Sequence, residues 1–117
     1  MNLITAIDLG SNSFRVLTYD CLNHKIINEY QEVVGMADGL IQTGNISFEA
    51  QQRVIKAINK SAEDLDYDPQ KAICVTTAAM RMANNADEVL KILEQKTGAQ
   101  FRIIDGIEEA RLTLLAV

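Results

Sequence analysis

Apolar residues in the first third of the chain fall in three short segments that are separated by polar turns. The first segment covers Leu3–Ile7 and ends at the polar stretch Asp8–Ser13. The second covers Phe14–Tyr19 and the third covers Lys25–Val34, with Leu22–Lys25 as the turn between them. Short β-rich segments joined by turn residues predict three strands that follow one another as an antiparallel meander.

The remainder of the chain predicts alternating helices and strands. Met36–Leu40 is predicted as a loop, and Ser47 as the N-cap of a helix that runs to about Asp64, because apolar residues then recur at helical spacing. A strand is then predicted over Ala72–Thr76, a turn or short helix over Thr77–Arg81, and a helix that Gly98 caps over Asn85–Gly98. A further strand is predicted over Phe101–Ile104 and a last helix over Ile107–Val117.

This order of elements predicts an α/β fold. Alternating strands and helices call for parallel strands joined by right-handed crossovers, here added to an antiparallel meander. The result is a mixed five-stranded sheet with helices on its faces, which matches the ribonuclease-H-like layout. The chain ends in the apolar run Leu114–Val117 without a cap. We interpret that end as a domain cut and expect residues 1–117 to form a single lobe.

Composition restricts the class of protein. Hydrophobic residues make up 48% and charged residues 23% of the chain, a balance typical of a soluble globular domain. No apolar run approaches the roughly 20 residues of a membrane span, so the simplest expected location is the cytoplasm and no membrane partner is expected. The net charge of −5 argues against nonspecific nucleic-acid binding, which needs clustered Lys and Arg.

The cysteines and the histidine do not form a metal-binding pattern. Cys21 and Cys74 have no CxxC spacing, and His24 is the only histidine. We expect both cysteines to be reduced and packed as small hydrophobic residues. A zinc site or a Ser/His/Asp triad is excluded unless another chain contributes to it.

The first candidate site is the turn after the first predicted strand. Gly10, Ser11, Asn12 and Ser13 form a tight polar turn whose backbone N–H groups and side chains suit a phosphate oxygen. Asp8, at the end of the preceding strand, suits a hydrated Mg²⁺. The alternative is an ordinary hairpin turn in which Asp and Asn cap their own backbone.

The second candidate follows the predicted central strand. Arg81 offers a planar fork to phosphate oxygens, and we expect the hydroxyls of Thr76 and Thr77 to assist in binding them. Ligands of open α/β sheets bind at this end of the strands. The alternative is a helix start whose arginine meets only solvent carboxylates.

The third candidate is the acidic pair Glu108–Glu109, which follows the last predicted strand. Adjacent residues on a helix point about 100° apart, so at most one of the two faces the sheet edge. A glutamate in a cleft can take a proton from a water that attacks phosphorus. The alternative is a solvated first helical turn that the helix dipole favours.

Together these segments resemble one family. The stretches Ala6–Arg15, Thr77–Ala86 and Ile103–Leu112 are similar, in the same order, to three blocks of the exopolyphosphatase / guanosine pentaphosphate phosphohydrolase family. The resemblance implies one ribonuclease-H-like lobe of the actin-like superfamily that includes sugar kinases, Hsp70 and actin. It further implies release of the terminal phosphate from inorganic polyphosphate or guanosine pentaphosphate, an alarmone of the stringent response, with Mg²⁺ as cofactor.

The resemblance also implies a role for each candidate residue. Glu109 corresponds to the catalytic glutamate that deprotonates water, Arg81 to the phosphate-binding arginine and Asp8 to the aspartate on the metal side. Gly10, Ser11, Asn12 and Ser13 correspond to the phosphate loop. Arg15 and Glu108 have supporting roles.

The chain departs from the family pattern at positions that concern phosphate binding, and mildly at Gly106–Ile107 before the acidic pair. The second phosphate loop, of the type Asp-Ile-Gly-Gly-Gly-Ser, does not occur in the 117 residues, and Gly35 stands where the family often has a basic residue. We therefore expect a missing C-terminal lobe as the main partner, and an isolated chain with little or no turnover. The acidic balance favours a short nucleotide alarmone over a long polyphosphate. The sequence leaves open whether two copies form a homodimer.

Two other functions remain open from the sequence. One is an ATP-dependent kinase of the same superfamily, which also opens with an Asp-x-Gly loop but lacks the second and third blocks. The other is a noncatalytic regulator that binds nucleotide or alarmone.

Overall fold

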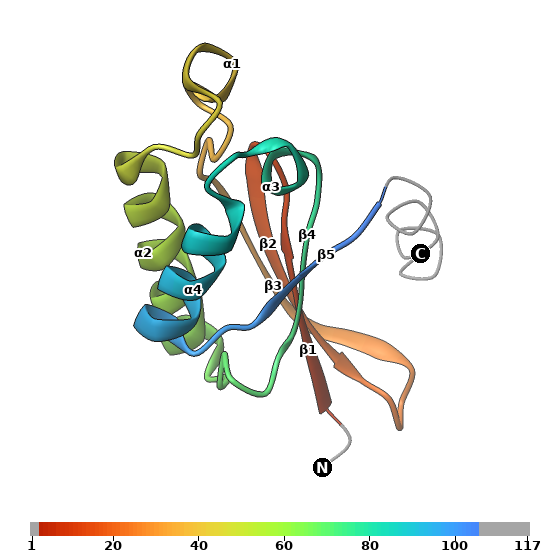
Figure 1. The fold of residues 1–117 in the computed structure, drawn as a ribbon. Helices are drawn as coiled ribbons and strands as arrows, with labels where there is room; N and C mark the ends of the chain where they lie inside the picture. The colour runs from red at the N-terminus through yellow and green to blue at the C-terminus, as the bar shows by residue number, and fades with distance from the viewer. Residues whose placement is uncertain (1–2, 106–117) are drawn as a thin grey trace.

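The computed structural model describes residues 3–105, in which an antiparallel meander leads into alternating helices and strands (Figure 1). The elements are β1 (Leu3–Leu9), β2 (Ser13–Asp20), β3 (Lys25–Val33), α1 (Leu40–Thr43), α2 (Phe48–Leu65), β4 (Ile73–Thr76), α3 (Ala78–Met82), α4 (Ala86–Thr97) and β5 (Phe101–Ile103).

The five strands form one mixed sheet in the order β3-β2-β1-β4-β5. β1, β2 and β3 pair antiparallel, whereas β4 and β5 run parallel to β1. Leu9 pairs with Thr76, and Thr76 pairs with Ile103, so the carboxyl ends of the three parallel strands lie level at one edge. This arrangement confirms the predicted α/β sheet and its ribonuclease-H-like layout.

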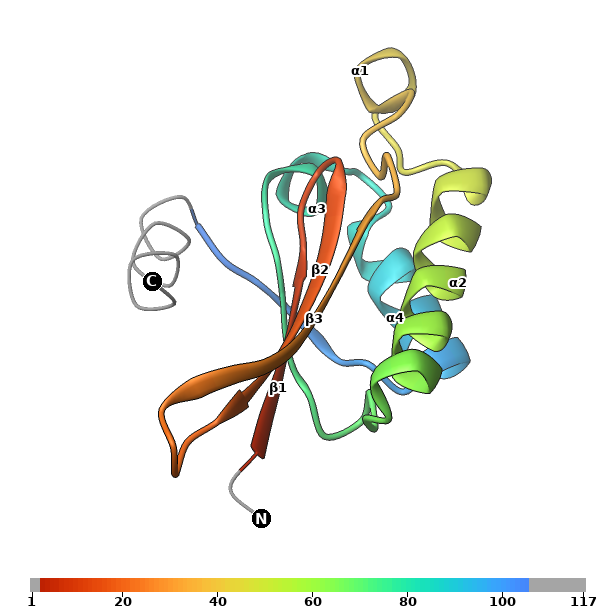
Figure 2. The same cartoon turned by 180° about the vertical axis from the view of Figure 1, so that it is seen from behind.

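Helices α2 and α4 both cover one face of this sheet, as the two opposite views show (Figures 1 and 2). Residues of β1 and β2 alternate in burial next to the turn between them, where Ile7 and Leu9 of β1 and the paired half of β2 point toward the helices and are almost wholly buried. They meet one apolar stripe of α2 in a single core. The core residues of these three elements are Ile7, Leu9, Phe14, Val16, Ala50, Val54, Ala57 and Ile58.

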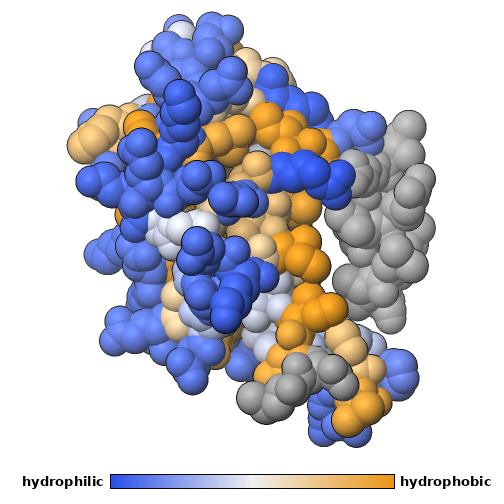
Figure 3. All heavy atoms as spheres, turned by 60° about the horizontal axis from the view of Figure 1, so that its bottom comes forward, coloured by the Kyte–Doolittle hydropathy of each residue, from blue (hydrophilic) through white to orange (hydrophobic). Residues whose placement is uncertain are grey.

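The other face of the sheet keeps apolar side chains exposed in the described part of the chain. Ile4, Tyr19 and Ile26 are partners in the register of β1, β2 and β3, and each is more than a third exposed. Ile73 on β4 is 56% exposed on the same face. Figure 3 shows polar residues over the helical side and apolar residues gathered along the sheet beside it. The helix predicted over Ile107–Val117 lies outside the described residues.

The predicted helix ends are confirmed at both long helices. The Ser47 hydroxyl accepts a hydrogen bond from the Ala50 N–H at 3.1 Å, which satisfies one free donor of α2. Asp66 ends α2 and Gly98 ends α4, each in the left-handed conformation. Asn85 precedes α4 as predicted, but its side chain binds the backbone N–H and carbonyl of Ile46 and makes no capping bond to its own helix.

Two local features differ from the sequence prediction. β1 continues to Leu9, so Asp8 lies within the strand and the following turn is shorter than expected. The predicted loop ends in the four-residue helix α1, which lies between Gly39 and Gly44, both with positive φ. Four residues are too few to show a helical repeat of apolar positions, which is why the pattern did not predict this helix.

The two cysteines are free, as the sequence predicted. Burial raises the pKa of the Cys74 thiol to about 11, so this thiol is protonated at neutral pH. Between residues 3 and 105, none of the helices is long and apolar enough to cross a membrane.

Candidate active site

The turn between β1 and β2 lies at the carboxyl edge of the sheet. Leu9 and Phe14 are the last residues paired in the two strands, and the Gly10 N–H donates to the Ser13 carbonyl at 2.9 Å. Ser11 and Asn12 therefore form the tip of the turn. Asn12 is exposed, whereas Ser11 and Ser13 are partly buried.

A second loop holds the carbonyl groups of this turn. The N–H groups of Val34 and Gly35 donate to the Asn12 carbonyl at 2.8 and 2.9 Å, and the Ala37 N–H donates to the Ser11 carbonyl at 2.8 Å. In a trans peptide the carbonyl and the following N–H point in opposite directions. The N–H groups of Asn12 and Ser13 are therefore directed away from this loop, an arrangement that suits an anion.

The turn is also joined to the segment after β4. The Ser11 hydroxyl oxygen accepts a hydrogen bond from the Ala79 N–H at 3.1 Å. Because that oxygen is the acceptor, the hydroxyl proton of Ser11 remains able to point toward a ligand. The Thr76 hydroxyl donates to the Leu9 carbonyl at 2.8 Å and is fully buried. The suggestion that Thr76 assists a phosphate is thus wrong, because its proton binds the backbone of β1.

Gly10 is not required by the geometry of the protein itself. It is absent from the glycines with positive φ, and a Cβ built on it would meet the Ser13 carbonyl oxygen at 3.4 Å, an ordinary contact. Gly35 differs in both respects, with φ of 58° and a Cβ position 2.6 Å from Asp38 Oδ2. The backbone of Gly10 is therefore accessible for close approach by a ligand.

Asp8 and Arg15 lie beside each other on the face of the sheet that points away from α2 and α4. They are partners in the β1–β2 register, and both are exposed. Arg15 also forms an ion pair with Glu29 at 3.1 Å, in which both side chains are nearly half exposed. An ion pair this exposed contributes little stability, on the order of 0–1 kcal/mol. Asp8 and Arg15 are thus neighbours across the two strands, one residue pair further from the turn than Leu9 and Phe14.

The described residues provide few ligands for a metal. Between residues 3 and 105, no group of three or more His, Cys, Asp or Glu side chains is arranged to hold an ion. The exposed carboxylate of Asp8 fits Mg²⁺, which takes oxygen ligands and usually keeps several of its waters. A single carboxylate would hold that ion weakly.

Arg81 lies at the same edge of the sheet but is bound to the backbone. Its guanidinium donates to the carbonyl of Ile104, and the Ile104 N–H donates to the Thr76 carbonyl at 2.9 Å. Arg81 therefore links α3 to the residue that follows β5. Its fork carries five donors, so this bond does not exhaust its capacity to bind an anion. The predicted pair Glu108 and Glu109 lies outside the described residues.

Sequence reasoning did not identify how residues 34–38 hold the turn. The only signal in the sequence was Gly35, which stands where the family often has a basic residue. The contacts themselves are made by backbone atoms, which any residue type except proline provides. A recess of about 510 Å³ lies at the opposite end of the sheet among Leu3, Ile27 and Tyr67, and is not part of this site.

Comparison with known proteins agrees with the resemblance seen in the sequence. The chain matches the model of the Ppx/GppA phosphatase family over residues 16–117. A Ppx/GppA family member from Aquifex aeolicus superposes with a TM-score of 0.83 at 24% identity, over 98% of this chain and 39% of that chain. An exopolyphosphatase from Cytophaga hutchinsonii superposes with a TM-score of 0.82 at 27% identity, over 94% of this chain and 36% of that chain.

A more distant likeness concerns the fold alone. The RuvC protein of T. thermophilus superposes with a TM-score of 0.51 at 8% identity, over 92% of this chain and 66% of that chain.

This chain spans well under half the length of the two Ppx/GppA relatives named above. Because the family model covers residues 16–117, which is most of the chain, the chain belongs to the Ppx/GppA phosphatase family.

Proposed function

We propose that the chain is the N-terminal lobe of a two-lobed, Mg²⁺-dependent phosphohydrolase that releases the terminal phosphate of inorganic polyphosphate or guanosine pentaphosphate. The observation that supports this most is the fixed turn Gly10–Ser13. The carbonyls of Ser11 and Asn12 are bound by the neighbouring loop, and the N–H groups of Asn12 and Ser13 are directed away from that loop. Fixed N–H donors of this kind stabilise phosphate without reorganising during the reaction.

The other residues of the proposal have distinct tasks. Arg81 binds a phosphate oxygen, and Glu109 takes the proton of the attacking water. Asp8 holds the magnesium ion, which neutralises charge on the phosphates when bound. Arg15 supports Asp8, and Glu108 supports Glu109. Asp8 and Arg81 both lie at or next to the edge where the turn lies, which is the arrangement that this division of tasks requires.

The reaction breaks one phosphoanhydride bond. A water oxygen bonds to the terminal phosphorus as the bridging oxygen departs with the electron pair of the broken bond. The water proton passes to Glu109, and inorganic phosphate and the shortened substrate leave. Catalysis in this class rests on positioning and on neutralising charge, so an incomplete set of phosphate donors should be ineffective.

The choice between the two substrates follows from charge. A net charge of −5 disfavours a long polyanion that extends beyond the site, and so favours guanosine pentaphosphate. Phosphate release by the full-length protein, meaning this chain joined to its second lobe, can be measured on both substrates at matched phosphate concentration. A higher kcat/KM on polyphosphate would contradict the preference but not the proposed reaction.

The isolated chain of residues 1–117 should fold but turn over little or no substrate. Residues 3–105 carry the turn Gly10–Ser13 for phosphate and Asp8 for the metal, and among them no second lobe faces this site to exclude water. Circular dichroism should show a cooperative unfolding transition, and phosphate release should stay at the level of a blank. Substantial hydrolysis of either substrate by this chain would contradict the two-lobed site.

Replacing Gly10 by alanine should weaken substrate binding without weakening the fold. The added Cβ meets only an ordinary contact in the protein but occupies space next to the turn, where a phosphate would approach. We expect KM to rise about tenfold or more, since a displacement on the order of 1 Å can cost about 100-fold. Steady-state kinetics and thermal unfolding of the full-length protein measure both effects.

Gly39→Ala is the matched control for Gly10→Ala. Gly39 has φ of 80° with open space around its Cβ position, so alanine there is strained but blocks nothing. The control should lose stability and keep KM, the reverse of the first variant. An unchanged KM in Gly10→Ala would remove the turn from the binding site.

A further inference from the structure

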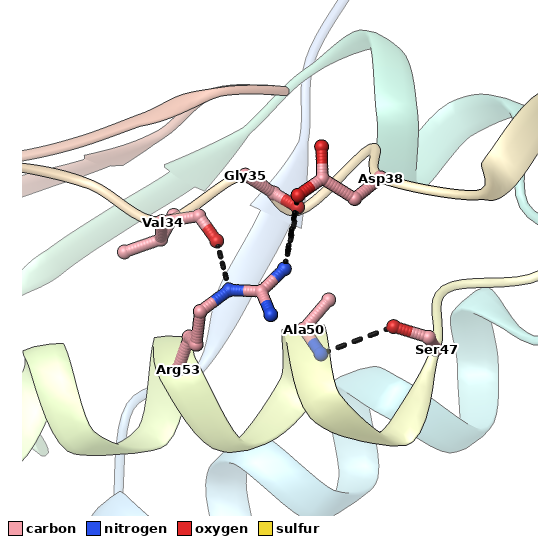
Figure 4. Close-up of polar contacts among 6 residues, drawn as sticks. All are labelled: Val34, Gly35, Asp38, Ser47, Ala50 and Arg53. Carbon is pink, nitrogen blue, oxygen red and sulfur yellow. Dashed lines mark hydrogen bonds and ion pairs between the residues drawn. The ribbon is translucent and has the colours of Figure 1, made fainter.

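Arg53 on α2 makes an unusual set of contacts for a surface arginine. Its Nε donates to the Val34 carbonyl at 2.6 Å, and its Nη2 donates to the Gly35 carbonyl at 3.0 Å (Figure 4). The same nitrogen lies 3.3 Å from Asp38 Oδ2. One planar fork thus binds two successive carbonyls and a carboxylate of one loop.

Arg53 binds the carbonyl side of the same loop whose N–H groups hold the Gly10–Ser13 turn. Val34 and Gly35 direct their N–H groups to the Asn12 carbonyl and their own carbonyls to Arg53. The loop is therefore held between the helix and the turn by hydrogen bonds to its backbone, from the Arg53 side chain on one side and to the Asn12 carbonyl on the other. A shift of the loop would move the Asn12 carbonyl, and with it the rigidly linked N–H of Ser13.

The loop has a conformation that glycine, but few other residues, adopts readily at position 35. Gly35 has φ of 58°, in the left-handed region, and the side chain of Asp38 occupies the space where a Cβ at Gly35 would lie. Arg53 neutralises this carboxylate while its fork fixes the two carbonyls. The Arg53 side chain is 42% exposed, so filling the core is not its main task.

We infer that Arg53 is a positioning residue for phosphate binding: it holds the loop Val34–Asp38, which fixes the turn so that the N–H groups of Asn12 and Ser13 face the substrate. The inference rests on the proposed function for its consequence in catalysis. The contact between Arg53 and the loop can be tested without it.

The test compares Arg53→Gln and Arg53→Lys with Lys56→Gln in the full-length protein. Lys56 is an exposed cation on the same helix, three residues away, and so controls for loss of surface charge. Lysine at position 53 keeps the charge and the stem but cannot bind both carbonyls with one planar group. Hydrogen exchange of the amides of residues 34–38 and steady-state kinetics with guanosine pentaphosphate are measured for each protein.

We expect the amides of residues 34–38 to exchange about tenfold faster in both Arg53 variants, because each variant loses hydrogen bonds to a charged group. KM should rise about tenfold with kcat changed less than about threefold, because the variants weaken substrate binding and leave the residues of the chemical step in place. Lys56→Gln should match the wild type in both measurements. Unchanged exchange in both Arg53 variants, faster exchange with an unchanged KM, or full rescue of exchange and KM by lysine would each overturn the inference.

The two proposals fail in different ways. If the wild-type protein releases no phosphate, the proposed function fails, and the exchange rates alone then decide whether Arg53 holds the loop. If the wild-type protein is active and the Arg53 variants resemble it, only the positioning role fails.

Discussion

Glu109→Gln in the full-length protein should lower the rate of phosphate release by about 10²- to 10⁴-fold, the usual contribution of a general base. Glutamine keeps the size of the side chain and its capacity for hydrogen bonds, but it cannot accept the proton of water. Substrate affinity should stay close to that of the wild type. Phosphate release and equilibrium binding of the Mg²⁺–substrate complex, measured on the same preparation, separate the two effects.

The control for this prediction is Glu63→Gln, which removes one exposed carboxylate from α2, away from the sheet edge. It should leave both the rate and the affinity unchanged. If the Glu109 variant keeps the wild-type rate, another residue activates the water. If the wild type binds alarmone without turnover, a noncatalytic regulator explains the protein better. Transfer of phosphate from ATP to an acceptor would instead indicate a kinase.

Phe14→Ala should lower the free energy of unfolding by about 3–5 kcal/mol, the usual cost of removing a buried aromatic ring. Phe14 is fully buried at the start of β2, directly after the turn, and its ring meets Tyr30 edge to face with centroids 6.1 Å apart. A domain has a total stability of only about 5–15 kcal/mol, so this loss should be visible in urea unfolding of the 117-residue chain.

Phe48→Ala is the matched control, since Phe48 is 69% exposed at the start of α2. Its loss should be within about 0.5 kcal/mol, as for most surface substitutions. Equal losses in the two variants would mean that the side of the sheet facing α2 is not the core.

The sheet and the long helices could be predicted because each leaves a periodic signal in the sequence. Alternating burial in β1 and β2 follows from the two-residue period of a strand, and Ser47 and Gly98 mark helix ends by their own chemistry. The edge at which the candidate residues gather could be predicted in the same way, because the carboxyl ends of parallel strands lie level at one edge of the sheet. The candidate residues from Asp8 to Ser13 and Arg81 are accordingly found at or beside that edge.

The contacts within the site could not be predicted in the same way. Arg53 stands beside the buried Val54 on an amphipathic helix, where an arginine is expected to face solvent. Its partners are backbone carbonyls 18 and 19 residues away, and no residue type marks a carbonyl as a partner. Thr76 likewise binds a backbone atom of β1, and Arg81 binds a backbone atom of the residue that follows β5. Such pairings depend on the final packing of elements rather than on local pattern.

The most direct test of the central claim is a crystal structure of the full-length protein with Mg²⁺ and a non-hydrolysable analogue of the substrate. The account predicts the terminal phosphate within hydrogen-bond distance of the Asn12 and Ser13 N–H groups, with Asp8, Arg81 and Glu109 around the same anion. An analogue bound at a site that excludes the Gly10–Ser13 turn would contradict it.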